Sequence, residues 1–209
     1  GSVYAVGVQQ RLASDHRRPR DVLLHLPMEP LDPAAMEGVE IGETFLLASD
    51  SPEQLRHKLD AALARVPAAI GINNHMGSRL TADQRAMTAI MPVLRERELL
   101  FLDSRTNPET VAAHQAEAAG VPTISRHVFL DHEPGREAIR QAIRQAAAHA
   151  RTQPTVAIAH PSIDLVEVLR EELPRLHDAK VGIYPLSEVL AASLDARLAA
   201  LPSARRAPP

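Results

Sequence analysis

Short runs of apolar and β-branched residues alternate along the chain with longer segments whose apolar positions recur every three or four residues. Runs of the first kind are typical of buried strands, and segments of the second kind are typical of amphipathic helices. Their alternation predicts an α/β fold of βαβ units around a largely parallel sheet or barrel. The expected strands are Val3–Val8, Asp21–Leu26, Ala69–Asn73, Leu99–Asp103, Thr123–Leu130 in one or two pieces, Thr155–His160 and Lys180–Tyr184.

Several of the expected helices carry their own start signals. Ser51 is followed by a proline and, three residues on, by Gln54, which is the pattern of a capping box. Thr81 and Gln84 repeat that spacing. The next apolar positions form a helical stripe that we expect to be core, namely Met87, Ile90, Met91 and Leu94. Further helices are expected from Asn107 to Gly120, around Ile139, Ile143 and Ala147, over Pro161–Leu173 and over Leu186–Leu201.

The composition is that of a globular protein, with 45% hydrophobic and 23% charged residues among 209. We expect one domain over residues 1–201 and a disordered Pro, Ala and Arg-rich tail over residues 202–209. The chain has only five aromatic residues and no Trp, which disfavours a pure carbohydrate-binding or single-strand-binding module. A net charge of -3 with scattered basic residues indicates no nucleic-acid partner. No membrane span or signal peptide is expected either.

Polar and titratable residues follow the expected strands, where α/β enzymes place their sites. The candidates are His25 and Glu29 after one strand, Asn73, Asn74, His75, Ser78 and Arg79 after the next, then Asp103 and Arg105, Arg126 and Asp131, and finally His160. Each also has a structural interpretation. His25 could be a core histidine, Asp103 and Asp131 could cap helices, and the arginines could pair with them. Five strand ends with titratable groups exceed what capping requires.

His75 is the strongest single candidate, because we expect it in a loop among Asn, Gly and Ser residues, where no apolar core needs an imidazole. Imidazoles and carboxylates without any cysteine suit Zn or another divalent first-row ion. Such an ion lowers the pKa of bound water to about 7 and so supplies hydroxide for hydrolysis of an amide or ester. His160 would suit the acid that protonates the leaving group.

The segments HLPMEP, GINNHMGSRLT, FLDSRT, RHVFLD and IAHP, in this order, resemble the divergent polysaccharide deacetylase family over about Val22 to Leu190. The resemblance implies a distorted, incomplete (β/α) barrel of the carbohydrate deacetylase superfamily. It also implies an Asp-His-His metal site that removes N- or O-acetyl groups from an acetylated glycan. Members are typically exported to the cell envelope, so a periplasmic or secreted location is implied, with an envelope protein as a possible partner.

Carried over by position, the resemblance makes His25 and His75 the metal ligands and His160 the general acid. It assigns Asp103, Arg126 and Asp131 to orienting roles in catalysis. The expected substrate-binding residues are Glu29, Asn73, Asn74, Ser78, Arg79 and Arg105.

The sequence departs from the family pattern at its start. The family opens with a strand that ends in two adjacent aspartates, whereas Val3–Val8 resembles the following strand, so we expect the barrel to lack its first strand. One metal carboxylate and the base would then be missing unless Asp103 or Asp131 substitutes. Three hypotheses stay open: a metal-dependent deacetylase, a non-catalytic envelope protein that binds a glycan or protein, and an unrelated metal hydrolase on a (β/α) barrel.

Overall fold

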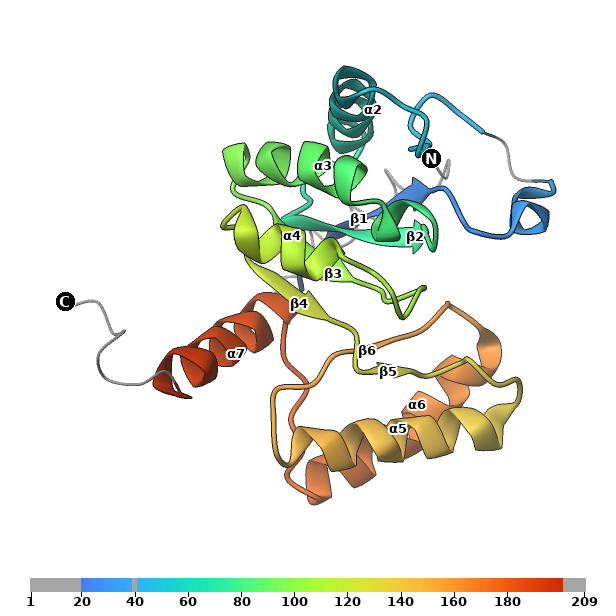
Figure 1. Cartoon of the computed structure of the whole chain (residues 1–209). Helices are drawn as coiled ribbons and strands as arrows, with labels where there is room; N and C mark the ends of the chain where they lie inside the picture. Colours follow the sequence, from blue (N-terminus) through green and yellow to red (C-terminus); the bar gives the residue numbers. More distant parts are fainter. Residues whose placement is uncertain (1–19, 39–40, 201–209) are drawn as a thin grey trace. The chain divides into compact units, whose positions relative to one another are not determined.

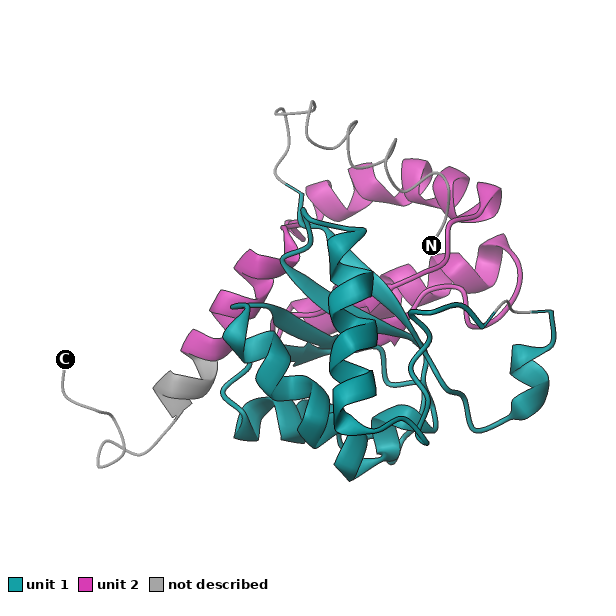
Figure 2. Cartoon of the chain, turned by 90° about the horizontal axis from the view of Figure 1, so that it is seen from above, with its two compact units in different colours: residues 1–125 teal, residues 126–209 magenta. Residues whose placement is uncertain are grey.

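The computed structural model describes residues 20–38 and 41–200. It is a mixed α/β structure with parallel strands, as the hydrophobic pattern predicts. The chain separates into two compact units, residues 1–125 and 126–209, which Figure 2 shows in different colours. The expected strand Val3–Val8 and the tail over residues 202–209 lie outside the described residues. Among the described residues, no helix combines the length and apolarity that crossing a membrane requires.

The described residues of unit 1 form a four-stranded parallel sheet in the order β1-β2-β3-β4, with helices on one face (Figure 1). Its elements are β1 (Leu23–Met28), the 3-10 helix η1 (Pro33–Met36), α2 (Pro52–Ala64), β2 (Gly71–Met76), the 3-10 helix η2 (Leu80–Ala82), α3 (Gln84–Glu96), β3 (Leu100–Asp103), α4 (Ala112–Ala118) and β4 (Thr123–Ser125). Strand β1 pairs with β2 over six residues, from Leu23 with Gly71 to Met28 with Met76. This pairing carries β2 three residues beyond the predicted strand end.

The pleat of β1 divides its side chains between two environments. Leu24, Leu26 and Met28 are buried in the core that α2, α3 and α4 cover. His25 lies between them in the sequence and is exposed. Because successive side chains of a strand point to opposite faces, the imidazole lies on the face that these helices leave uncovered.

The first predicted capping box is confirmed and the second is wrong. The Ser51 hydroxyl accepts a hydrogen bond from the Gln54 N–H, and the Gln54 side chain accepts one from the Ser51 N–H. Helix α3, however, is capped by Asp83, whose carboxylate accepts the Ala86 N–H at 2.9 Å. Thr81 lies in η2 and donates its hydroxyl to the Gly77 carbonyl at 2.8 Å. The predicted stripe of α3 is confirmed as core, since Met87, Ile90, Met91 and Leu94 are all fully buried.

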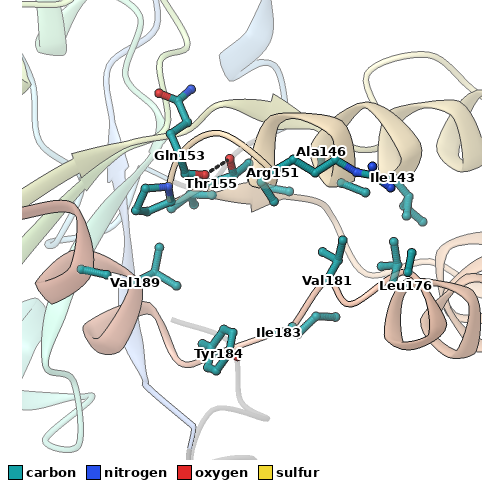
Figure 3. A pocket seen from close by; sticks show the side chains of 18 of the residues that line it. Ile143, Ala146, Arg151, Gln153, Thr155, Leu176, Val181, Ile183, Tyr184 and Val189 are labelled. Carbon is teal, nitrogen blue, oxygen red and sulfur yellow. Dashed lines mark hydrogen bonds between the residues drawn. The ribbon is translucent and has the colours of Figure 1, made fainter. Parts of the chain in front are cut away.

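The described residues of unit 2, 126–200, form a two-stranded parallel sheet and three helices. Its elements are β5 (Val128–Phe129), α5 (Arg136–Ala150), β6 (Ala157–Ile158), α6 (Ile163–Asp178) and α7 (Leu186–Ala200). Ile139 and Ile143 of α5 pack with Leu165 and Val168 of α6. The strand predicted over residues 180–184 is wrong, because this segment has no strand pairing in the described residues. It instead lines one side of a cavity of about 1040 Å³ whose walls also come from α5, α6 and α7 (Figure 3).

Ion pairs connect α5 to α6 beside their apolar contact. Arg140 reaches Glu171 at 2.6 Å and Glu172 at 3.3 Å, and Arg136 reaches Glu167 at 2.6 Å. Hydrogen bonding from Arg140 lowers the pKa of the exposed Glu171 carboxyl. Glu172 differs from the other acids because its side chain is only 3% exposed. Among the acids paired between α5 and α6, Glu172 is therefore the one whose ionised form depends most on its arginine partners.

We expect Glu172→Gln to lower the free energy of unfolding by about 1–3 kcal/mol, because a buried group loses its charge-assisted hydrogen bonds. Urea unfolding followed by circular dichroism measures this change. Glu167→Gln is the matched control, and with a side chain 44% exposed it should cost less than about 1 kcal/mol. Equal effects of the two substitutions would contradict the assignment.

Candidate functional site

Two histidines from neighbouring strands meet on the sheet face that the helices of unit 1 leave uncovered. His25 in β1 pairs in register with Asn73, and His75 in β2 pairs with Pro27, so both imidazoles lie on one side of the pleat. His75 Nδ1 lies 3.0 Å from His25 Nε2, and the ring centroids are 4.7 Å apart. The prediction that His75 stands in a loop is wrong, because the pairing with β1 continues through Met76.

This nitrogen pair has the spacing of two ligands on one cation. Two imidazole nitrogens bound to Zn at about 2.0–2.1 Å in tetrahedral geometry lie about 3.3 Å apart. The observed 3.0 Å is close to that value and also allows a hydrogen bond between a protonated and an unprotonated nitrogen. No cluster of three or more His, Cys, Asp or Glu side chains suited to a metal occurs within residues 20–38 and 41–200. The described chain thus offers two imidazoles toward a cation.

The turn that follows His75 is held by the buried side-chain amide of Asn74. Met76 and Gly77 have φ values of 54° and 84°, so the chain leaves β2 through a left-handed turn. Asn74, which is 1% exposed, donates to the Met76 carbonyl at 2.8 Å and accepts the Ser104 N–H at 2.8 Å. One amide therefore ties the end of β2 to the loop after β3, and its predicted contact with substrate stays a prediction.

A second set of contacts ties the loop after β1 to the same turn. The Ser78 hydroxyl accepts the Leu31 N–H at 2.8 Å. The Glu29 carboxylate accepts the Ala48 N–H at 2.6 Å and lies 3.4 Å from the Arg79 Nε. Ser78 and Glu29 therefore hold loop backbone, and the Arg79 side chain pairs with the Glu29 carboxylate. Any contact of these residues with a ligand would come in addition to those roles.

Asn73 and Arg105 are two further predicted substrate-binding residues, and their contact with a ligand stays a prediction. Asn73 lies on the same pleat face as the two histidines, is half-buried, and donates to the Ser104 hydroxyl at 3.2 Å. Arg105 is exposed and has a φ of 49°, which places its side chain on a tight turn after β3.

Asp103 has a structural environment. It is fully buried, its Oδ1 accepts the Arg105 N–H at 2.8 Å, and its Oδ2 accepts the Thr110 hydroxyl at 3.0 Å. In the sheet register Leu102 lies opposite Asn73, so Asp103 is on the other pleat face, with Phe101. The carboxylate thus braces the loop between β3 and α4, and the structure does not bring it to the imidazole pair.

Two residues of that loop, Thr106 and Asn107, were not predicted to shape the site. Thr106 donates to the Met76 carbonyl at 2.8 Å, and Asn107 donates to the Ser78 carbonyl at 2.7 Å. The sequence signal was present, because Asn before Pro is typical of a turn. Asn107 indeed accepts the Glu109 N–H at 2.9 Å, and α4 begins only at Ala112, so the predicted helix start at Asn107 is wrong.

Unit 2 holds the other predicted catalytic residues, which form a group of their own. Asp131 Oδ2 lies 3.1 Å from His160 Nδ1, and both carboxylate oxygens accept the His160 N–H, at 3.2 and 3.1 Å. The Asp131 side chain is 17% exposed and the His160 side chain 62%. The Phe129 ring contacts the His160 ring, and the Arg126 guanidinium lies over the Phe129 ring. A carboxylate at Nδ1 fixes which imidazole nitrogen is presented outward.

A parallel α/β sheet with paired imidazoles on one face is the arrangement expected of a deacetylase-like domain. The family model described as divergent polysaccharide deacetylase matches residues 4–190, and the chain belongs to that family. It is 37% identical over 157 residues to the uncharacterized protein YibQ of Escherichia coli and 37% identical over 158 residues to an uncharacterized protein of Haemophilus influenzae.

Both relatives are longer than this chain. The matches cover 75% of the chain but 48% of YibQ and 55% of the Haemophilus protein, so the chain spans about half the length of these relatives. Among solved structures, an uncharacterized protein of Agrobacterium tumefaciens superposes with a TM-score of 0.69 at 23% identity. That match covers 82% of this chain and 69% of the other, and at this identity it supports the fold alone.

Proposed function

We propose that this domain is a metal-dependent deacetylase that hydrolyses acetyl groups on a cell-envelope or other N-acetylated polysaccharide. The observation that carries the proposal is the 3.0 Å approach of His75 Nδ1 to His25 Nε2, on the sheet face opposite the helices of unit 1. Zn is the cation that a pair of imidazoles without thiolates suits best. Family membership supports the reaction class, and the periplasmic or secreted location is part of the same proposal.

In the proposed reaction, water adds to the acetamide carbonyl, the C–N bond breaks, and acetate and a free amine leave. A bound divalent cation would supply an acidified water and a polarised carbonyl. His25 and His75 would hold that cation from two adjacent strands. His160 of unit 2 stays the proposed general acid: its outer nitrogen would take up a proton and deliver it to an amine, and Asp131 at Nδ1 would orient the ring.

The test measures acetate and free amine released from acetylated glucosamine oligomers. The chain is purified without immobilised nickel, treated with a chelator, and supplied with Zn, Co or Mn. We expect no release from the chelated protein and equal amounts of acetate and amine after metal is returned. Absence of release with all three metals would exclude the deacetylase activity on these substrates.

A non-catalytic envelope protein that binds a glycan or protein is the second candidate. One observation favours it: Asn74, Ser78 and Asp103 each hold loop backbone, so the motif residues have a reason to be present without catalysis. This candidate predicts that the acetylated oligomers bind, that no acetate forms, and that His75→Ala leaves their affinity unchanged.

A further inference from the structure

Phe129 contacts two members of the polar group of unit 2, which consists of Arg126, Asp131 and His160. It is half-buried at the end of β5 and pairs in register with Ile158 of β6. Its neighbour Val128 is 5% exposed and points to the core. Because strand side chains alternate, Phe129 lies on the opposite face from Val128, and Asp131 follows in the turn two residues later.

The same register brings His160 to this face. The Leu130 N–H donates to the Ile158 carbonyl at 2.9 Å, which extends the strand pairing beyond Phe129. His160 is two residues after Ile158, just as Asp131 is two residues after Phe129. Asp131 and His160 therefore follow the ends of β5 and β6 at the same spacing, and their contacts bring one aromatic ring, one carboxylate and one imidazole together.

Two contacts fix the Phe129 ring in that assembly. Its centroid lies 5.3 Å from the His160 ring centroid with an interplanar angle of 78°, which is the edge-to-face geometry that aromatic pairs prefer. The Arg126 Cζ lies 5.3 Å from the Phe129 centroid, over the ring. A cation at this position is attracted to the negative face of the ring.

We infer that Phe129 is a positioning residue that holds the His160 imidazole against Asp131, with the Arg126 guanidinium packed on the same ring. The hydrogen bond at Nδ1 restrains one edge of an imidazole whose side chain is 62% exposed. The ring of Phe129 restrains it in a second direction, so that Nε2 keeps one orientation. The positioning itself is independent of the proposed function, and only its effect on turnover rests on that function.

The test reads the tautomer of the neutral His160 ring by nitrogen-15 NMR of the full chain, which needs neither metal nor substrate. We expect His160 of the wild type to hold its proton at Nδ1. We expect Phe129→Leu to shift the tautomer ratio about 2- to 12-fold toward the Nε2–H form, because the free energy of one aromatic contact corresponds to a change of that size. Phe129→Tyr keeps the ring and should keep the wild-type ratio. His132→Ala is the control, because it removes the other ring near Phe129, at 6.4 Å.

If Phe129→Leu leaves the ratio unchanged, or Phe129→Tyr shifts it as much as Leu does, the inference is overturned. A measurement on the wild type remains decisive if Phe129→Leu does not fold: cross-relaxation between the ring protons of Phe129 and His160 must be observed, and its absence overturns the inference. Where acetate release is found, Phe129→Leu should lower kcat about 2- to 12-fold and leave KM unchanged. If the wild-type protein releases no acetate, the proposed function fails. The tautomer ratio of His160 still decides whether Phe129 positions this ring.

Discussion

His75→Ala and His25→Ala should each abolish stoichiometric Zn binding, while the wild-type chain binds one Zn. The two nitrogens lie 3.0 Å apart, so we expect them to bind as a pair, and loss of either leaves one imidazole of that pair. Loss of an outer-shell partner alone costs about 10- to 100-fold in metal affinity, and loss of a ligand should cost more. Competition with a fluorescent chelator measures the affinity, and acetate release should fall below detection in both variants.

His57→Ala is the matched control for this experiment, because His57 is exposed on α2, in the same unit. It should bind Zn as the wild type does. If His75→Ala retained the wild-type affinity, the imidazole pair would not be the cation site and the proposed mechanism would fail.

Gly71→Ala should destabilise the protein by about 3 kcal/mol, the upper part of the range for overpacking a core. A Cβ at Gly71 would lie 2.5 Å from the Leu100 carbonyl oxygen and 2.5 Å from the Leu100 Cγ. Gly71 starts β2 and pairs with Leu100, so neither backbone can retreat without loosening the central pair of the sheet. Urea unfolding measures the loss, and the midpoint should fall with little change in its slope.

Gly42→Ala provides the comparison at a glycine with open surroundings. No atom lies within 4 Å of the Cβ that it would gain, and Gly42 is exposed. We expect a change between zero and a gain of about 1 kcal/mol, because alanine restricts the unfolded chain. Similar losses at the two glycines would mean that the close approach to Leu100 is not the cause.

The parts of the fold that the sequence predicted well are those that local pattern determines. The capping box at Ser51 and the buried stripe of α3 depend on residues three or four positions apart, and both formed as expected. Strand Leu100–Asp103 is an uninterrupted apolar run that ends in an aspartate, and its predicted bounds differ from the observed ones by a single residue.

The failures occurred where a distant partner decides the structure. The segment over residues 180–184 has the composition of a strand, but in the described residues it lacks a paired neighbour. His75 lies among Asn, Gly and Ser residues that suggest a loop, yet pairing with β1 keeps it in a strand. The failure at Thr81 was local instead: its hydroxyl donates to the Gly77 carbonyl four residues before it, and Asp83 caps α3.

The sequence predicted which residue types form the candidate site, but it did not predict which of them hold loops and which are open to a ligand. The sequence placed His25 and His75 near each other because parallel strands share an edge, and the structure brings them together. It could not separate side chains that hold loops from those open to a ligand. That distinction depends on which pleat face Asp103 occupies and on which carbonyls Asn74 meets, and neither follows from local sequence.

The alternation along β1 and β2 also bears on how this family can change over time. Even-numbered positions of β1 fill the interior, while its position 25 and positions 73 and 75 of β2 share the opposite side of the sheet. Side chains at these three positions lie outside the core cluster that the helices cover, so we expect ligand preferences to change there without repacking that core. Relatives with the same architecture are therefore free to diverge in chemistry, and likeness of backbone alone is a poor guide to what each one acts upon.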